Sequence, residues 1–226
     1  SYIIAVEELS RVDGSTAATI AADNSLGISP IKEYGTKEQK EKYLPLLCKT
    51  HLWGFGLTEE TAGCDSRGTK STARLEDDKW VLNGTKIFIT NSATPMTLGS
   101  TVQVVSGEKN GKPEFTTFLM ENDTPGFTQE PMNRKMMWRA SNTGRLTFNN
   151  VELTNDNMLG APGQGSHIML ATLDGGRLSI AAMALGCAQG AYEMALAYSK
   201  EREQFGKQIC KFQAVSFKLA DMAMKI

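Results

Sequence analysis

The spacing of hydrophobic residues changes twice along the chain and divides it into three blocks. Up to about residue 52 the apolar residues follow a helical period, and the same period returns after Pro162. Between these blocks, from about Trp53 to Met158, apolar and polar residues alternate as they do in strands. We therefore predict three domains: a partial N-terminal helical domain (1–52), a middle β-domain (53–160) and a partial C-terminal helical domain (161–226). Helices, then strands, then helices indicate an α+β fold.

The helical blocks carry local signals of their own. Thr36 followed by Gln39 fits a capping box, and 17–22 suits an earlier helix. The long segment 168–200 is rich in Ala, Met and Leu and nearly uncharged, so we expect a helix buried between other helices. A second helix is predicted from about Phe212 to the end of the sequence.

Within the middle block, Asn83-Gly84 separates two strand-like runs, 79–82 and 86–90. Because Asn-Gly favours positive φ, we predict a hairpin turn there. A second strand pair, 102–105 with 115–119, is predicted around 107–113, and Arg145–Phe148 alternates as a further strand.

Composition narrows the possible functions. The chain has 226 residues, 41% of them hydrophobic, and a net charge of −1, which argues against non-specific binding to nucleic acid. No run of about 18 apolar residues occurs, so we predict no membrane span. The four cysteines form no CxxC pair, and we interpret them as thiols in a reducing compartment. His51 and His167 lack partners at metal-ligand spacing, so we predict no metal site. Both ends read as helix interiors, so we expect a chain truncated at both ends, in which targeting signals are not readable.

No nucleotide-binding motif of the GxGxxG or GxxxxGK[ST] type is present, so a dinucleotide would not be held in the Rossmann manner. The segment 55–65 leaves a short strand for a loop of small and polar residues. It is readable as a plain surface loop or as the polar rim of a ligand site. Phe88 and Thr90 would share one face of a strand. Taken alone they suit a core ring and a strand-end hydroxyl, but ring and hydroxyl could also meet one flat ligand.

Two further segments carry charges that need partners. Asp174-Gly175-Gly176-Arg177 lies inside the long helical pattern, where two glycines cost about 1 kcal/mol each relative to alanine. A pair between Asp174 and Arg177 at i, i+3 and a ligand site explain this segment equally well. Arg202, near the end of the long helix, suits either a solvated helix end or a phosphate contact.

Taken together, these segments resemble the acyl-CoA dehydrogenase family, most closely its short-chain, butyryl-type branch, over essentially the whole chain. The resemblance implies an N-terminal helical domain, a middle antiparallel β-barrel-like domain and the start of a C-terminal helical bundle. It also implies FAD as cofactor, an acyl-CoA substrate, an electron-transfer flavoprotein as partner, and a homotetramer built as a dimer of dimers. The location implied is the cytoplasm of a bacterium or the mitochondrial matrix of a eukaryote.

The resemblance assigns roles residue by residue. The loop from Phe55 to Cys64 is similar to the first flavin loop of the family, although Glu60 replaces a usual proline and Cys64 a usual serine. Phe88-Ile89-Thr90 resembles the family's W-I-T, and 135–143 resembles K-x-G-x-R-x-S-x-T with Met137 in place of glycine. The implied cofactor contacts are Phe55, Leu57, Thr58, Gly63, Cys64, Phe88, Ile89, Thr90, Arg202, Phe205 and Gln213, the last three reaching the FAD of a neighbouring subunit. The implied substrate contacts are Cys64, Asp174, Gly175, Gly176 and Arg177.

The chemistry implied is α,β-dehydrogenation of a short-chain acyl-CoA to the trans-2-enoyl-CoA, in which a carboxylate removes the α-proton. No Y-E-G-T-like segment occurs, and Gly176 stands where another branch has its glutamate. We therefore assign no catalytic base, expect it beyond Ile226, and expect this chain to be inactive alone. The replacements at Glu60, Cys64, Phe88 and Met137 leave open a non-catalytic CoA-binding or scaffolding relative, and an acyl-CoA oxidase is a further alternative.

Overall fold

A computed structural model describes residues 1–226, which separate into two compact units. The first, here called the sheet unit, comprises residues 19–177. The second, the helical unit, comprises residues 1–18 and 178–226. Two helices, α2 (Gly14–Ala22) and α5 (Gly165–Glu201), contribute residues to both units.

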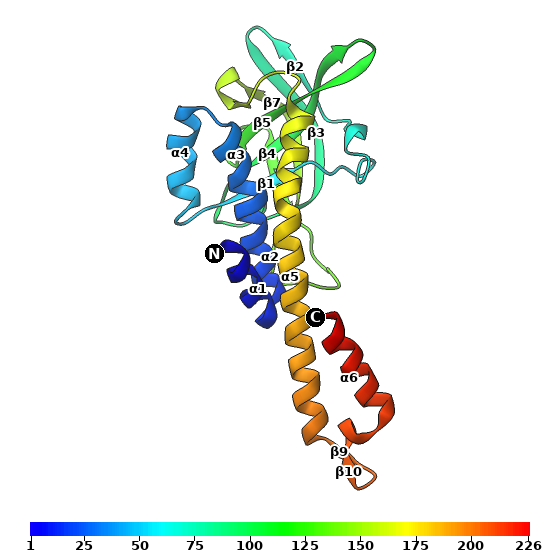
Figure 1. Cartoon of the computed structure of the whole chain (residues 1–226). Helices are drawn as coiled ribbons and strands as arrows, with labels where there is room; N and C mark the ends of the chain where they lie inside the picture. The colour runs from blue at the N-terminus through cyan, green and yellow to red at the C-terminus, as the bar shows by residue number, and fades with distance from the viewer. The chain divides into compact units, whose positions relative to one another are not determined.

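The sheet unit is built on one eight-stranded sheet (Figure 1). Seven strands follow the order β6-β7-β3-β2-β4-β5-β8, and the eighth strand, β1, pairs with β4. Neighbouring strands are antiparallel except that β1 and β2 run parallel to β4. The strands are β1 (Leu52–Gly56), β2 (Thr72–Glu76), β3 (Lys79–Thr90), β4 (Thr97–Lys109), β5 (Lys112–Glu121), β6 (Phe127–Pro131), β7 (Thr143–Leu153) and β8 (Met158–Leu159).

The α+β fold, with helices, then a middle domain rich in mainly antiparallel strands, then helices, is confirmed. The barrel-like form needs a correction. The sheet is open, because β6 at one end pairs only with β7 and the two-residue β8 at the other end pairs only with β5. One cluster of buried apolar residues, including Leu82, Val102 and Phe118, forms the core between the strands.

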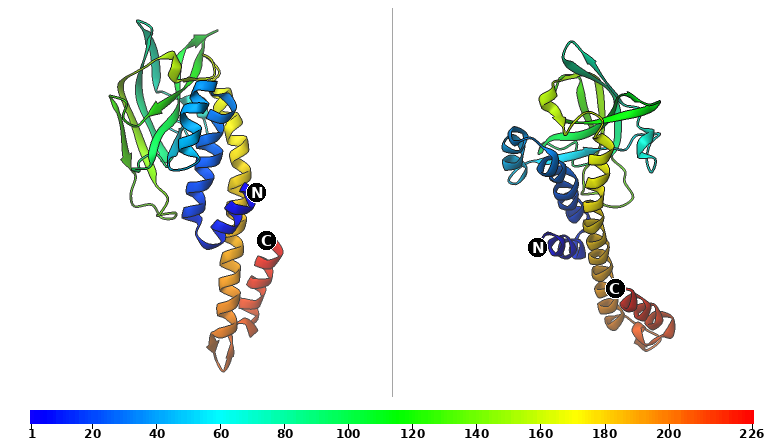
Figure 2. Two further views of the ribbon diagram at one scale, coloured as in Figure 1. Left: turned by 90° about the vertical axis from the view of Figure 1, so that its left-hand side faces the viewer. Right: turned by 45° about the horizontal axis from the view of Figure 1, so that its top comes forward.

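Helices cover one side of the sheet unit (Figure 2). They are the π-helix η1 (Asp23–Ile28), α3 (Ser29–Tyr34), α4 (Lys37–Leu47) and the start of α5, and the short 3₁₀ turns η2 (Ser66–Gly68) and η3 (Asn155–Asn157) lie in loops. A second apolar cluster joins these helices to the sheet through Ile31, Tyr43, Leu47, Trp53, Leu119, Leu159 and Ile168. The capping box is confirmed: the Gln39 backbone N–H donates to the Thr36 hydroxyl, and the Gln39 side chain accepts from the Thr36 N–H.

The hairpin predicted at Asn83-Gly84 is wrong. β3 runs without interruption through this dipeptide, and the turn between β2 and β3 is Asp77-Asp78, where φ is 45° and 68°. Gly84 instead marks a register shift against β7, with φ +144° and so little room that a Cβ would be 2.3 Å from the Ser71 hydroxyl oxygen. Aspartate also tolerates positive φ, which allows the turn to form earlier than Asn-Gly indicated. The pairing of β4 with β5 is confirmed, through a turn at Asn110-Gly111.

The helical unit contains α1 (Tyr2–Val12), the beginning of α2, residues 178–201 of α5, and α6 (Gln213–Lys225). The strands β9 (Glu203–Gln204) and β10 (Lys207–Gln208) and the turn η4 (Ile209–Lys211) join α5 to α6. Glycine allows α1 to approach α5 closely, because a Cβ on Gly186 would be 2.1 Å from the Glu7 carbonyl oxygen. Arg11 also forms an ion pair with Glu193 at 2.7 Å.

The long helix exists as predicted, but it is not buried on all sides within this chain. Leu178 and Met194 are 65% and 75% exposed. The prediction of no membrane span needs a qualification, because α5 is long and apolar enough to cross a membrane by length and composition alone. That is weak evidence for a span, since core helices of soluble proteins meet the same criterion.

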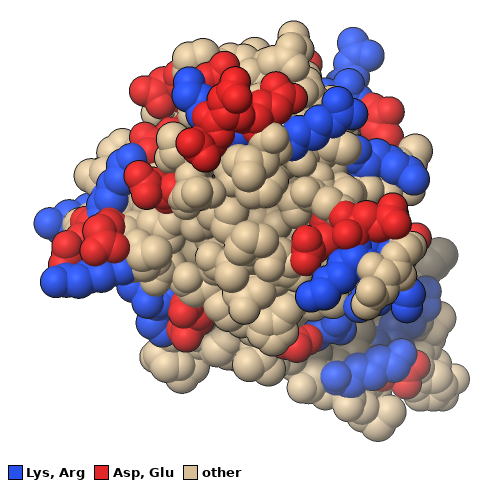
Figure 3. Space-filling model, turned by 90° about the horizontal axis from the view of Figure 1, so that it is seen from above, with Lys and Arg blue, Asp and Glu red and all other residues tan.

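The charged surface shows no block of a single sign on the face seen from above (Figure 3). Lysines and arginines alternate there with aspartates and glutamates around a central area without charged side chains. This mixture agrees with the net charge of −1.

Candidate functional site

A pocket of about 380 Å³ lies inside the sheet unit, where the end of β1, the end of β3, the π-helix and the first turns of α5 meet. This volume falls within the range of small-molecule sites. Its lining is mostly apolar, with three hydroxyl groups, one thiol and one charged group. The lining residues are Ala22, Leu26, Trp53, Phe55, Leu57, Thr58, Gly63, Cys64, Ser66, Phe88, Ile89, Thr90, Leu170, Leu173 and Arg177.

One wall of the pocket is the loop that follows β1. Leu57 is buried, the Thr58 side chain is half-buried, and Cys64 is an exposed free thiol. Main-chain bonds hold this loop to β3, since the Ile87 N–H donates to the Thr58 carbonyl oxygen over 2.9 Å. The loop is therefore a fixed wall attached to the sheet.

A buried ion pair lies behind that wall. The Lys86 ammonium, fully buried, is 2.7 Å from a Glu59 carboxylate oxygen. The Lys70 and Ser71 N–H groups also donate to this carboxylate. Burial raises the pKa of Glu59, but the Lys86 charge and the hydrogen bonds outweigh it and hold that pKa below its usual value. Burial lowers the pKa of Lys86 against the attraction of Glu59. Glu59 is thus a structural carboxylate and not a free base.

The second wall is the end of β3. The strand shifts register against β7 between Lys86 and Ile89, and Phe88 adopts φ +60° in this bulge. The bulge breaks the alternation of faces, so that Phe88, Ile89 and Thr90 all reach the pocket. Phe88 is 61% exposed, so it is not a core phenylalanine. A bulky side chain at positive φ is a strained conformation of the kind that clusters at functional sites.

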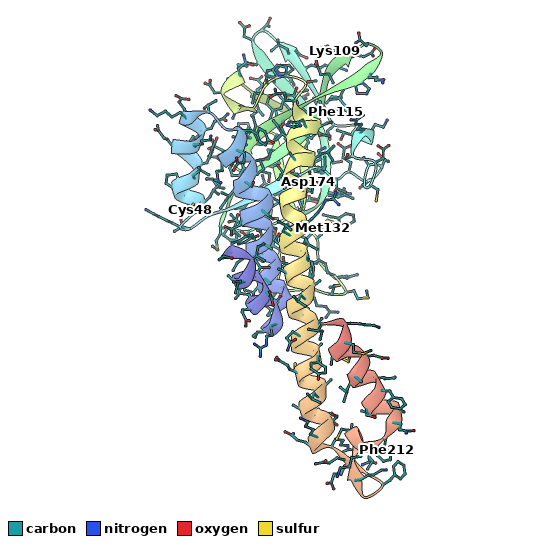
Figure 4. The ribbon with its side chains drawn as sticks, in the orientation of Figure 1. Cys48, Lys109, Phe115, Met132, Asp174 and Phe212 are labelled. Carbon is teal, nitrogen blue, oxygen red and sulfur yellow. The ribbon has the colours of Figure 1, made fainter.

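The start of α5 closes the third side. Leu170, Leu173 and Arg177 lie at i, i+3 and i+7 and present one face of the helix to the pocket. The Arg177 guanidinium is 3.4 Å from the Asp174 carboxylate, and both side chains are exposed. Asp174 lies on α5 (Figure 4) and is not one of the residues that line the pocket.

The close approach expected at the two glycines is found at one of them. A Cβ on Gly176 would be 3.0 Å from a Leu26 methyl group, whereas a Cβ on Gly175 would meet nothing within 4 Å. Gly176 therefore lets α5 pack against the π-helix segment that lines the pocket. Asp174, Gly175 and Gly176 border the pocket without lining it.

The remaining predicted contacts lie in the helical unit. Arg202, Phe205 and Gln213 are all exposed there, and Phe205 forms an edge-to-face ring contact with Phe212. They are not part of the pocket of the sheet unit. Part of the segment 135–143 lines a separate hollow, formed by residues 131–135 and 139–143. There Lys135 donates to the Thr143 hydroxyl over 2.9 Å and to the Ser141 carbonyl oxygen.

Sequence reasoning missed the residues that line the pocket from its helical sides. Ala22 and Leu26 lie at i, i+4, and Leu170 and Leu173 lie at i, i+3. This spacing signals one helix face, but it is the same signal that a core contact gives. Trp53 was also missed, because a buried tryptophan ring reads as core.

The pocket combines an aromatic ring, apolar walls and hydroxyl groups that are free to bind a ligand. The side chains of Thr58 and Thr90 form no hydrogen bond within the chain. No carboxylate lines the pocket, and Arg177 is its one charged lining residue. Such a site suits a flat ring with polar edges and, beside it, an uncharged or anionic chain.

Comparisons with known proteins agree with this arrangement. The N-terminal, middle and C-terminal domains of acyl-CoA dehydrogenase match residues 1–51, 54–151 and 163–226. The chain is 47% identical to a short-chain specific acyl-CoA dehydrogenase of Megasphaera elsdenii, covering 100% of this chain and 59% of that protein. It thus spans about three fifths of that relative's length.

Solved structures show the same fold. Butyryl-CoA dehydrogenase from Megasphaera elsdenii has a TM-score of 0.92 and 46% identity, over 99% of this chain and 58% of that one. A chain in a structure described as the electron transferring flavoprotein of Acidaminococcus fermentans gives the same TM-score, identity and coverage. An acyl-CoA dehydrogenase from Bacillus anthracis in complex with FAD has a TM-score of 0.90 and 35% identity, covering 99% of this chain and 37% of that one. The chain belongs to the acyl-CoA dehydrogenase family.

Proposed function

We propose that this chain provides the flavin and thioester-binding part of an FAD-dependent dehydrogenase that converts a short-chain acyl-CoA to its trans-2-enoyl-CoA. The observation that carries the proposal is the pocket itself. It brings together segments far apart in the sequence, the loop at Thr58 and Cys64, the bulge at Phe88–Thr90 and Arg177 of α5.

The residues of the pocket fit FAD. The exposed Phe88 ring would cover one face of the flavin, and the unpaired hydroxyls of Thr58 and Thr90 would bond its polar edge. When bound, FAD supplies a two-electron acceptor for the hydride that leaves the β-carbon. Arg202, Phe205 and Gln213 would reach the FAD of a neighbouring copy, as expected in a homotetramer, and their exposed side chains suit contacts outside their own unit.

The substrate would lie along the side formed by Cys64 and α5. The Cys64 thiol can form only a weak hydrogen bond, so contacts from the helix have more weight in orienting the thioester. The apolar side chains of Leu170 and Leu173 exclude water from the reacting carbons. Glu59 is tied to Lys86 and no carboxylate lines the pocket, so we assign the base that removes the α-proton to none of the pocket residues.

The electrons would pass to an electron-transfer flavoprotein. The fold's close match in a structure described by that name supports this partner. The 61% exposure of Phe88 supports it as well, because a flavin covered by this side chain would lie near the surface of the sheet unit.

The full-length protein that contains this chain tests the proposal. We expect it to be yellow, to bind FAD stoichiometrically, and to dehydrogenate butyryl-CoA with an electron-transfer flavoprotein or a dye as acceptor. Thr90→Val keeps the shape and removes one hydroxyl, so FAD binding should weaken by up to about tenfold. Thr85→Val, on the same strand but outside the pocket, is the matched control and should change nothing. A colourless protein that cannot be reconstituted with FAD would contradict the proposal.

A second candidate is an oxidase that uses the same flavin site with oxygen as acceptor. The fold is shared by a prolyl acyl carrier protein oxidase with a TM-score of 0.91 and 33% identity, covering 99% of this chain and 59% of that one. Stoichiometric release of peroxide during turnover, without any gain from an electron-transfer flavoprotein, would favour the oxidase.

A further inference from the structure

The buried ion pair of Glu59 and Lys86 lies between the two walls of the pocket. Glu59 belongs to the loop wall, one residue after Thr58, and Lys86 belongs to β3, two residues before Phe88. Their side chains are 6% and 0% exposed, and their charged atoms are 2.7 Å apart. Each therefore touches a different wall from behind, without lining the pocket.

Hydrogen bonds connect this ion pair to both ends of the loop. The Lys86 ammonium also donates to the Leu57 carbonyl oxygen over 3.2 Å, so that it holds the loop on both sides of Thr58. The Glu59 carboxylate accepts from the N–H groups of Lys70 at 2.7 Å and Ser71 at 3.1 Å, where the loop returns to the sheet. One carboxylate and one ammonium thus fix the beginning and the end of the loop against β3.

The register of β3 against β7 also changes at Lys86. The shift against β7 begins at Lys86 and puts Phe88 at φ +60°. A buried charge can satisfy its hydrogen-bonding capacity only in a narrow range of positions, so a paired Lys86 restricts where the bulge begins. The ion pair between Lys86 and Glu59 would then set the distance between the pocket residues Thr58 and Phe88, although neither of these two takes part in it.

We propose that the Glu59–Lys86 ion pair is a positioning device that sets the distance between the Thr58 loop and the Phe88–Thr90 bulge, and so the fit of the flavin ring. This inference rests on the proposed function, because it takes the ligand of the pocket to be FAD. Neither residue is a catalytic residue. Both act through the groups that line the pocket.

The test uses the full-length protein, stripped of FAD and titrated with FAD. Glu59→Gln and Lys86→Met each leave one buried charge without its partner, and we expect the FAD dissociation constant to rise by about 10- to 100-fold. The absorption maxima of the bound flavin should shift, because the polar edge of the ring loses its aligned hydroxyls. The double variant, which removes both charges, should recover part of the lost affinity relative to either single variant.

The chain offers two matched controls. Glu60 is adjacent in the loop and pairs with Arg145 on the surface, and Lys79 lies on the same strand and pairs with Glu152 at 2.6 Å. Glu60→Gln and Lys79→Met remove exposed partners, so FAD affinity and the flavin spectrum should stay as in the wild type.

The results of these variants separate a positioning role of the ion pair from a purely structural one. If Glu59→Gln lowers the unfolding temperature of the apoprotein but binds FAD with wild-type affinity and spectrum where it is folded, the pair is only structural and the inference fails. If Glu59→Gln does not fold, Glu59→Asp keeps the charge but shortens the reach, and a wild-type flavin spectrum in that variant would overturn the inference. If the wild-type protein binds no FAD, the proposed function fails first, and this inference with it.

Discussion

The two units of the chain bury their apolar side chains to different degrees. In the sheet unit Leu82 and Phe118 have no exposed surface, and each lies inside a continuous cluster. In the helical unit Phe217 and Met194 are 63% and 75% exposed. The sheet unit therefore contains the contacts that stabilise it, whereas the helical unit presents apolar surface that only contacts outside these residues can cover.

The difference extends to the candidate functional residues. Those of the sheet unit are held by bonds within the chain, as Thr58 is through the Ile87 N–H. Those of the helical unit, such as Phe205, extend into solvent. A residue that must bind within its own chain needs a fixed place, and one that must bind a neighbouring copy needs exposure.

The largest expected effect follows directly from this contrast in burial. Phe118→Ala removes a ring that contacts Trp80 inside the sheet core, and the free energy of unfolding should fall by about 3–5 kcal/mol. Phe217→Ala removes an exposed ring, and the change should stay within about 0.5 kcal/mol. Urea denaturation of both variants at low protein concentration measures the two values. Equal losses would mean that Phe217 is buried by contacts absent from this chain.

A smaller effect depends on pH, because only the sheet unit buries a carboxylate without an ion partner. Burial raises the pKa of Asp23 to about 6, and the single bond from the Trp53 N–H only partly opposes this. The folded state therefore keeps the proton between about pH 4 and pH 6, where the unfolded chain releases it, so stability falls as pH rises through that window. Asp23→Asn should be the more stable protein at pH 7, by up to about 3 kcal/mol, and should lose this advantage near pH 4.

The helical unit offers a control of opposite sign. Hydrogen bonds from Gln189 and Arg11 lower the pKa of Glu193, so its contribution is present at neutral pH and is lost as the pH falls. Glu193→Gln should therefore be slightly less stable than the wild type at pH 7 and equal to it in acid. Urea denaturation at several pH values measures the free energy of unfolding of both variants and the wild type. If Asp23→Asn were more stable than the wild type by the same amount from pH 4 to pH 8, burial would not be raising the pKa of Asp23.

The sequence predicted most of the helices and the β4–β5 pair, because periodicity and capping are local signals. The capping box at Thr36 and the turn near Asn110 depend on residues within a few positions of each other. The turn at Asn83-Gly84 was predicted wrongly because the sequence does not reveal that Ser71 packs against Gly84 and that β7 continues beside it. Those contacts join residues far apart in the chain.

The candidate site was predictable only through its resemblance to a family. From spacing alone, Phe88 read as a core residue, because the bulge that exposes it depends on pairing with β7. The burial of Lys86 against Glu59 has no local signal either, since a lysine in a strand ordinarily faces solvent. The helical side of the pocket was missed for the same reason, as a stripe of leucines has the same spacing in a core and in a ligand site.

The smallest expected effect compares two turns, one in each unit. Asp77-Asp78 in the sheet unit and Phe205-Gly206 in the helical unit are both two-residue turns with positive φ at both positions. Aspartate tolerates this conformation, whereas for phenylalanine it is an outlier that costs about 1–2 kcal/mol. Phe205 is 93% exposed and offsets little of that cost through its contact with Phe212. Phe205→Asn should therefore raise the free energy of unfolding by about 0.5–1 kcal/mol, and Asp77→Asn should leave it nearly unchanged.

A gain in stability at Phe205 would show that the phenylalanine does not serve the fold of its own chain. The same variant in the full-length protein should then bind FAD less tightly, because the residue proposed to reach a neighbouring copy's FAD is gone. Denaturation and FAD titration of one variant thus separate the two contributions. If Phe205→Asn were less stable than the wild type, the ring would be packing in the helical unit after all. The contrast between site residues held within their own unit and site residues that extend into solvent would then lose its clearest case.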